Sequence, residues 1–114
     1  MLSERGRRAL LGIIENIEAA LDFTTDLSFE EFEGNRLRLY GVTRCLEIIS
    51  EASRRVGEET RTRNAHIPWR RIADSGNVYR HRYERVSARL LWGTVHEPLP
   101  GLLVVCQNEL RVGE

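Results

Sequence analysis

The sequence predicts an all-α protein, an up-down helical bundle of two long antiparallel helices with two or three shorter ones. Apolar residues recur at spacings of three and four along most of the chain, as on one face of a helix. No stretch alternates apolar and polar residues as a half-buried strand does. The 114 residues suffice for one core. We therefore expect one helical domain, residues 1–114.

The first long helix is predicted over residues 3–23. Ser3 is a suitable N-cap because its hydroxyl can accept a hydrogen bond from an otherwise unpaired backbone N–H of the first turn. Five apolar residues then form a single stripe, and we expect this stripe to face the core: Leu10, Ile13, Ile14, Ile17 and Leu21.

The second long helix is predicted over residues 29–56. Ser28 and Glu31 have the spacing of a capping box, in which each side chain bonds the other residue's backbone N–H. A long apolar stripe follows, and Gly34 weakens the helix locally. Gly57 is expected to end it.

A polar connection over residues 58–66 is expected to lead to a third helix. Pro68 suits the first helical turn, where its missing N–H costs no hydrogen bond. Ala73 and Gly76 lie on the face of this helix that also carries Ile72. Because these two side chains are small, we expect another backbone to approach closely there.

The last part of the chain predicts two more helices. The apolar period breaks for a few residues after Tyr83, and Ser87 then caps a short helix. Residues 96–100, with two prolines, are predicted to form a turn. The final apolar stripe contains Leu99, Leu102, Leu103, Cys106 and Leu110.

The charge is balanced overall but uneven along the chain. All 17 basic residues are Arg, against 17 acidic residues. Residues 61–89 hold eight Arg and only Asp74 and Glu84, a net charge of +6. Such a basic stretch indicates either a polyanionic partner, such as RNA, or internal ion pairing with the acidic first half of the chain.

Several kinds of chemistry are not supported by the sequence. No apolar run is long enough to cross a membrane and no signal peptide precedes the first helix, so we expect a cytoplasmic protein. Neither a metal-ligand spacing nor a glycine-rich phosphate loop is present, and we expect no metal and no cofactor. Cys45 and Cys106 lie on apolar stripes and are predicted to be reduced core thiols.

The stretch G-N-V-Y-R-H-R-Y, residues 76–83, is the strongest candidate for chemistry. Arginines beside His81 disfavour its cationic form, so the neutral ring can act as a base. Arg80 can bind a phosphate and Tyr83 can stack on a nucleobase. These groups suit metal-free RNA cleavage. The alternative is that His81 caps the C-terminus of the third helix and that the arginines are solvated or ion-paired with the second long helix.

Four segments resemble the HEPN superfamily, in particular the HepT-like toxins of HepT/MntA toxin–antitoxin pairs. They are R-C-L-E-I-I-S-E-A (44–52), I-P-W-R-R-I-A (67–73), N-V-Y-R-H-R-Y (77–83) and the L-P-x-L start of the last helix (99–102). The resemblance covers nearly the whole chain. It implies a helical bundle that dimerises and, in active members, a metal-independent ribonuclease.

The family motif is Arg, a polar residue, three further positions, His, any residue and Tyr. Asn77, His81 and Tyr83 match it, whereas Gly76 stands where the family has Arg. The resemblance implies that His81 is the base and Asn77 an orienting group. Arg80, or Arg82 across a dimer, would then supply the guanidinium that binds the phosphate.

The resemblance also implies partners. We expect a homodimer that acts on RNA and pairs with an MntA-like nucleotidyltransferase antitoxin, which would silence the toxin by adenylylating Tyr83. Tyr83 is otherwise expected to contact the substrate, with Arg82. The alternative is a catalytically degenerate HEPN module that docks the nucleotidyltransferase through the basic stretch.

Overall fold

The computed structural model describes residues 2–81 and 87–113, and for residues 77–81 and 113 it describes the backbone alone. All regular structure in these ranges is helical, which confirms the predicted all-α class. In chain order the helices are α1 (Glu4–Thr25), α2 (Phe29–Glu33), α3 (Arg36–Ser53), α4 (Glu58–Arg63), α5 (Trp69–His81), α6 (Ala88–His96) and α7 (Pro98–Gly113).

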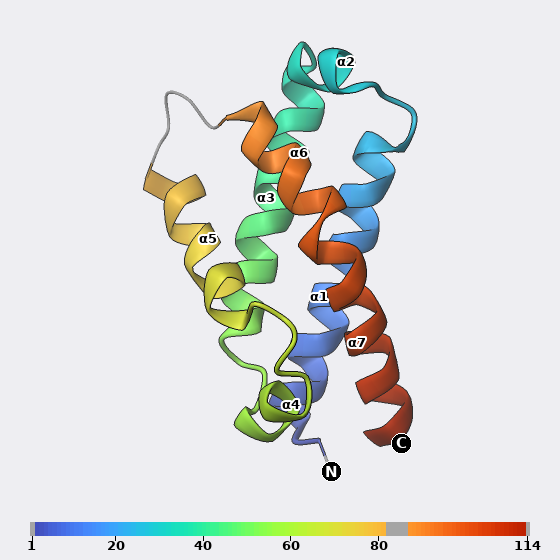
Figure 1. The fold of residues 1–114 in the computed structure, drawn as a ribbon, viewed down its shortest axis with the longest axis vertical. Helices are drawn as coiled ribbons and strands as arrows, with labels where there is room; N and C mark the ends of the chain where they lie inside the picture. The colour runs from blue at the N-terminus through green and yellow to red at the C-terminus, as the bar shows by residue number, and fades with distance from the viewer. Residues whose placement is uncertain (1, 82–86, 114) are drawn as a thin grey trace.

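The two longest helices, α1 and α3, run antiparallel along the middle of the bundle (Figure 1). Helix α7 packs along α1, whereas α5 packs along α3 on the other side. Helix α6 crosses above both long helices and also contacts α2. The bundle is 44 Å in its longest dimension, and both termini lie at the end that carries α4. The arrangement leaves α5 attached to the bundle mainly through α3.

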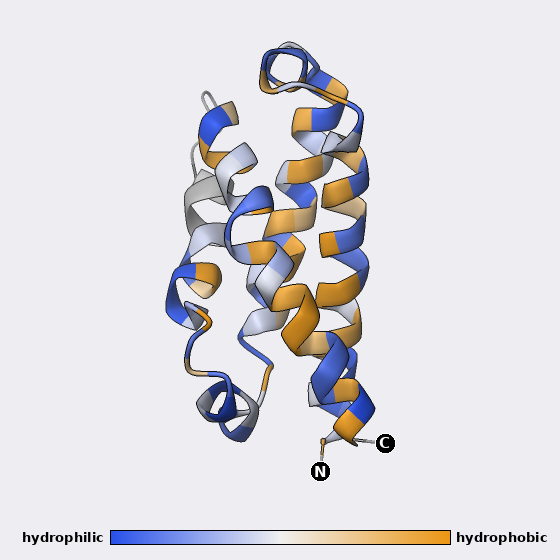
Figure 2. Ribbon diagram, turned by 45° about the vertical axis from the view of Figure 1, so that its right-hand side comes forward, coloured by the Kyte–Doolittle hydropathy of each residue, from blue (hydrophilic) through white to orange (hydrophobic). Residues whose placement is uncertain are grey.

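The core forms between the long helices and the two C-terminal helices. Figure 2 shows hydrophobic and hydrophilic residues alternating along the helical turns, as the apolar stripes predict. No helix in the described ranges is long and apolar enough to cross a bilayer. The largest fully buried apolar side chains are Phe32, Leu10, Ile13, Ile17, Leu46, Ile49, Leu91, Leu99, Leu102, Val42 and Val95.

Three predicted helix starts are confirmed by their hydrogen bonds. Ser3, Ser28 and Ser87 each accept a bond from the backbone N–H three residues on, at 2.9, 3.1 and 3.3 Å. Glu31 completes the capping box by accepting a bond from the Ser28 N–H at 2.9 Å. Each of these bonds satisfies a backbone donor that the helix itself leaves unpaired.

The prediction of a single helix over residues 29–56 is wrong, because the helix is interrupted after about one and a half turns. Helix α2 ends at Glu33, and α3 begins at Arg36. Asn35 lies between them, and its side-chain oxygen accepts a hydrogen bond from the Arg38 N–H at 3.0 Å. An Asn that can cap a new helix next to Gly34, a poor helix former, favours a fresh start over a continuous helix.

Two predicted connections also contain helix. The polar stretch 58–66 includes α4, which begins directly after Gly57 and has two acidic residues in its first turn. The turn predicted over 96–100 is reduced to Glu97, because α7 begins at Pro98. A proline with its fixed φ suits this first position. Both differences concern short segments whose helicity depends on end effects more than on an apolar stripe.

An aromatic cluster fastens α6 to the α2 end of the bundle. The Trp92 ring meets Phe32 at 5.4 Å and Phe29 at 5.8 Å between centroids, the second pair edge to face. The Arg89 guanidinium lies 4.6 Å from the centre of the Phe29 ring. Such ring contacts add to the gain from burial. They fix the position of α6 against α2.

Candidate functional site

Helix α5 carries the first part of the candidate motif. Two residues of its N-terminal half, Trp69 and Ile72, attach it to the bundle. The Trp69 Nε1 donates a hydrogen bond to the Asn64 carbonyl at 3.0 Å, which ties the first turn to the preceding loop. One turn on, Ile72 is 4% exposed and joins the core. The predicted Pro68 start of this helix is confirmed to within one residue.

The contact between α5 and α3 is centred on Ser50. The Ser50 Oγ donates to the Ala73 carbonyl at 2.6 Å and accepts from the Gly76 N–H at 3.0 Å. Arg54 Nη2 also donates to the Ala73 carbonyl, at 2.6 Å. Ser50 is fully buried, and Gly76 is buried as well. The predicted close approach at Ala73 and Gly76 is therefore confirmed, and its partner is Ser50.

This contact leaves no room for a side chain at position 76. A Cβ built on Gly76 would collide with the Ser50 Oγ and lie only 2.7 Å from the Ser50 Cβ. The Glu47 carbonyl is next nearest, at 3.9 Å. Gly76 is therefore matched to Ser50 by packing, so the residue at the motif Arg position has a structural role in this chain.

The residues predicted to form the site lie at the C-terminal end of α5 and beyond it. Asn77, Arg80 and His81 belong to the last turns of α5, where the structure describes their backbone but not their side chains. Arg82 and Tyr83 lie outside the described residues. The structure thus places the first three on one helix end, within five residues of each other.

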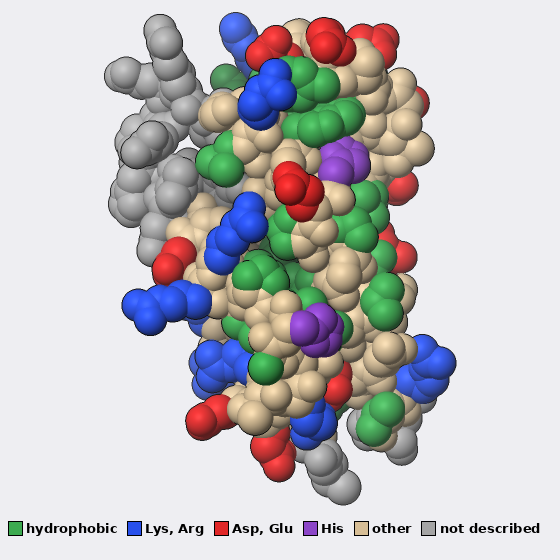
Figure 3. Space-filling model, viewed as in Figure 1, with side chains coloured by type: hydrophobic (Ala, Val, Ile, Leu, Met, Phe, Trp, Pro, Cys, Tyr) green, Lys and Arg blue, Asp and Glu red, His purple; other side chains and the backbone are tan. Residues whose placement is uncertain are grey.

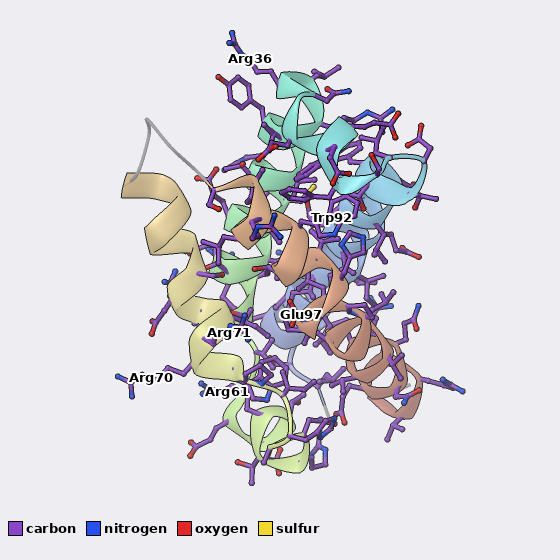
Figure 4. The ribbon with its side chains drawn as sticks, turned by 45° about the horizontal axis from the view of Figure 1, so that its top comes forward. Arg36, Arg61, Arg70, Arg71, Trp92 and Glu97 are labelled. Carbon is purple, nitrogen blue, oxygen red and sulfur yellow. The ribbon has the colours of Figure 1, made fainter. Side chains whose placement is uncertain are left out.

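The arginines of the basic stretch whose side chains are described all face outward. Within the described ranges no ion pair joins residues 61–89 to residues 1–60. Arg63 pairs instead with Glu109 of α7 at 2.7 Å, and Arg70 meets Asp74 at 4.0 Å. Arg61, Arg70 and Arg71 are exposed, and Figure 4 shows them along the α4–α5 side of the molecule. The described arginines of this stretch therefore do not form ion pairs with the acidic first half of the chain, and a polyanionic partner stays a prediction.

Neither cysteine is suited to act as a nucleophile. Cys106 is fully buried, and burial raises the pKa of its thiol to about 12. Cys45 is 5% exposed, and burial raises its pKa too. The thiolate is the reactive form of cysteine, so both thiols are inert near neutral pH. The prediction that both are core residues is confirmed.

Neither histidine whose side chain is described lies in a candidate catalytic cluster. His96 Nδ1 lies 2.8 Å from the Trp92 carbonyl and Nε2 lies 3.3 Å from the Thr24 Oγ1, at the C-terminus of α6. His66 is exposed in the α4–α5 connection. Within the part of the chain that the structure describes, no three His, Cys, Asp or Glu side chains gather closely enough to hold a metal ion.

The structure also shows a hollow between α5 and α6 that the sequence did not predict. Arg71, Asp74 and Ser75 line it from α5, directly before the motif, and Leu90 lines it from α6. Its floor is apolar and comes from α3 and α7. No local pattern could have indicated it, because its walls come from four helices distant in sequence.

Comparison with known proteins identifies the family to which this bundle belongs. The family model described as "Ribonuclease HepT-like" matches residues 13–108, from the middle of α1 to the last turns of α7. The chain belongs to the HepT-like ribonuclease family. The matched range includes Ser50, Gly76 and every residue of the candidate motif.

Curated relatives agree with this assignment over nearly their full length. "Putative RNase MJ1380" of Methanocaldococcus jannaschii is 35% identical over 100 residues, 87% of this HepT-like chain and 92% of the relative. "Probable ribonuclease HepT" of Thermococcus cleftensis is 38% identical over 90 residues, 79% of this chain and 82% of the relative. No solved structure gives a significant match. The resemblance to HepT-like proteins inferred from the sequence is confirmed.

Proposed function

We propose that the chain is a metal-independent endoribonuclease that acts through Asn77, Arg80, His81 and Tyr83. Its membership in the HepT-like ribonuclease family carries the proposal. The outward-facing arginines of α4 and α5 support it, because RNA binding depends first on neutralising phosphates. The four residues lie within seven positions of the sequence, around the C-terminal end of α5.

The proposed reaction uses the ribose 2′-hydroxyl of RNA as its own nucleophile. His81 removes the hydroxyl proton while the 2′-oxygen attacks the adjacent phosphorus. The bond from phosphorus to the 5′-oxygen then breaks, and that oxygen takes up a proton. The products are a 2′,3′-cyclic phosphate and a free 5′-hydroxyl. Because negative charge builds on the phosphoryl oxygens, a guanidinium held close to them lowers the barrier.

Arg80 is proposed to supply that guanidinium. Position 76, where the family has its Arg, is closed by Ser50 and cannot hold one in this packing. Arg80 is one helical turn further along α5 and immediately precedes His81. Arg82 is the second candidate, acting across a dimer.

We further propose that the chain works as the toxin of a toxin–antitoxin pair and forms a homodimer. Leu37 and Tyr40, one turn apart on α3, are 79% and 67% exposed, and a dimer contact at this position would remove both from water. The partner antitoxin would be an MntA-like nucleotidyltransferase. It would transfer an adenylyl group from ATP to the Tyr83 hydroxyl, releasing pyrophosphate. Light scattering after gel filtration measures the dimer, whose mass should fall to that of the monomer in Leu37→Ser/Tyr40→Ser.

Expression in a bacterial host tests the ribonuclease proposal. Inducing the wild-type chain without its antitoxin should arrest growth and fragment cellular RNA. His81→Ala should abolish both effects at equal protein levels, whereas His66→Ala, an exposed histidine outside the motif, should not. If the wild-type chain, soluble and folded, leaves growth and RNA unchanged, the ribonuclease proposal is wrong.

The Ser50–Gly76 contact favours a second candidate function. A chain whose packing excludes the motif Arg could have kept only the fold and the binding surface. It would then dock the nucleotidyltransferase through the arginines of the basic stretch without cutting RNA. Binding that is lost on neutralising Arg61, Arg70 and Arg71, together with absent RNA cleavage, would support this function over the first.

A further inference from the structure

The hollow between α5 and α6 has the shape and lining of a small-molecule site. Its volume is about 320 Å³, near the lower end of the range for ligand pockets. Leu46 and Ile49 of α3 and Leu99 of α7 form its floor, and Leu90, which is 43% exposed, forms one wall. Figure 3 shows hydrophobic side chains recessed between the two walls. A flat apolar body could lie against these aliphatic groups.

Polar groups of α5 line the opposite wall and retain hydrogen-bonding capacity. Arg71 is exposed and has no hydrogen bond or ion pair with any described residue. The Asp74 carboxylate is 67% exposed, and among the described residues its one ion pair is with Arg70, at 4.0 Å. The Ser75 Oγ donates to the Ile72 carbonyl at 2.7 Å, so its oxygen can still accept a bond.

An apolar floor beside the exposed Arg71 guanidinium and the exposed Asp74 carboxylate matches the chemistry of a nucleotide. The two faces of a nucleobase are apolar and stack on side chains, whereas its edge carries amino and carbonyl groups. A carboxylate can only accept hydrogen bonds, so it selects bases with an exocyclic amino group. The phosphate attached to such a base requires a cation, and Arg71 lies at the rim.

The position of the hollow links it to the motif. Asp74 precedes His81 by seven residues of the same helix, about 10.5 Å at the rise of 1.5 Å per residue. A nucleotide held at Asp74 would therefore be close along the strand to the one cut at His81, without being the same one.

We propose that this hollow is a nucleobase subsite for the RNA substrate, selective for bases that carry an amino group. The base lies against Leu90, above the buried Leu46 and Ile49, while Asp74 accepts a hydrogen bond from the amino group and Arg71 binds the neighbouring phosphate. This inference rests on the proposed ribonuclease function. An apolar side chain of a partner protein is the competing occupant.

Binding of short RNA tests the subsite separately from cleavage. End-labelled hexamers of adenylate, cytidylate and uridylate are titrated at one fixed salt concentration with the His81→Ala protein, which leaves the RNA intact. Fluorescence anisotropy should give about tenfold tighter binding of the adenylate and cytidylate hexamers than of the uridylate hexamer. In that background Asp74→Asn, whose amide can also donate to uracil, should reduce this preference to about twofold.

Two matched pairs of variants locate the effect. Ser75→Phe should fill the hollow and weaken adenylate binding about tenfold, whereas Ser75→Ala should not. Arg71→Gln should weaken all three hexamers similarly, whereas Arg36→Gln, the same charge change at the far end of α3, should have little effect. Circular dichroism checks the fold of each variant, and Asp74→Asn keeps the test valid if Ser75→Phe does not fold.

The possible outcomes separate the subsite from the proposed function. Equal affinity for the three hexamers, or unchanged binding by a folded Ser75→Phe protein, would overturn the subsite even if the protein with His81 intact cuts RNA. No binding would overturn it too. A change of oligomeric mass in Ser75→Phe with unchanged RNA affinity would assign the hollow to a protein contact. If the base preference is found as predicted but the wild-type protein, with His81 intact, does not cut RNA, the subsite is supported and the ribonuclease proposal is refuted.

Discussion

The Ser50 side chain occupies the space that any side chain at position 76 would need. It bonds the Gly76 N–H at 3.0 Å and the Ala73 carbonyl at 2.6 Å, and its Cβ lies 2.7 Å from where a Cβ on residue 76 would be. Real Cβ atoms essentially never approach so closely. A glycine at this motif position is thus required by the way α5 packs on α3.

Gly76→Ala should destabilise the protein by about 1–3 kcal/mol, because the added methyl group must push α5 away from α3. Elsewhere in a helix the same substitution is stabilising by about 1 kcal/mol. Gly12→Ala in α1 is the matched control, since a Cβ there meets nothing within 4 Å. Urea unfolding followed by circular dichroism measures both. Equal effects of the two substitutions would refute the packing described here.

Gly76→Arg can restore the family motif only together with Ser50→Gly. Removing the Ser50 hydroxyl alone leaves the Cβ at 2.7 Å, so Ser50→Ala does not open enough space. We expect Gly76→Arg and Ser50→Ala/Gly76→Arg to be poorly folded. Ser50→Gly/Gly76→Arg should fold and cut RNA at about the wild-type rate, because Arg80 already supplies the guanidinium that binds the transition state in the proposed site.

The rate of RNA cleavage by the folded double variant decides how far the native site depends on Arg80. An unchanged rate is expected if Arg80 fills the role, whereas a rate at least tenfold above that of the wild type would mean that Arg80 does not fill it. Loss of the added rate in a triple variant that also carries His81→Ala would show that the new arginine acts with the same base. A tenfold gain that persists without His81 would contradict the proposed site.

Local interactions made much of the bundle predictable. The caps at Ser3, Ser28 and Ser87 involve residues three positions apart, so the sequence alone indicates them. Ala73 and Gly76 indicated that another helix approaches α5 closely, because small residues on one helix face leave room for a neighbouring backbone. Their partner Ser50 could not be predicted, because the register between α3 and α5 is a tertiary property.

The errors have the same physical origin. An uninterrupted apolar stripe predicted one helix through Asn35, but the side chain of that residue caps a new helix and the stripe continues across the break. The hollow before the motif was missed because its walls come from four helices. The site residues Asn77, Arg80 and His81 were placed on the end of a helix correctly, and their chemistry stays a prediction.

Acid should weaken the connection between α4 and α7. Arg63 and Asn64 hydrogen bond the Glu109 carboxylate, and the Arg63 bond is the main cause that lowers the Glu109 pKa below its ordinary value of 4.5. A lowered pKa contributes stability above the ordinary value, and this is lost as the pH falls through the lowered one.

Glu109→Gln should therefore cost stability at pH 7 and progressively less below about pH 4.5. Thermal unfolding from pH 3 to pH 7 measures this difference. Glu18→Gln, on the exposed face of α1 and in no ion pair with described residues, is the control and should lack this dependence. A constant difference between Glu109→Gln and wild type across the range would contradict the assignment.

The thiols of Cys45 and Cys106 should be unreactive in the native protein. Cys106 has its pKa raised to about 12 and Cys45 is buried, so neither supplies a thiolate at pH 8. A colorimetric disulfide reagent should detect no thiol within minutes in buffer and two thiols in guanidinium chloride. Rapid native reaction, or loss of RNA cleavage after alkylation of the folded chain, would contradict the core assignment.

RNA cleavage by the purified chain in the presence of EDTA tests the central claim most directly. We predict fragments that end in 2′,3′-cyclic phosphate and 5′-hydroxyl groups, and a rate at least a hundredfold lower for His81→Ala, in keeping with the loss of a general base. Rates that are equal for the wild-type and His81→Ala proteins, or cleavage that stops when EDTA is added, would contradict it.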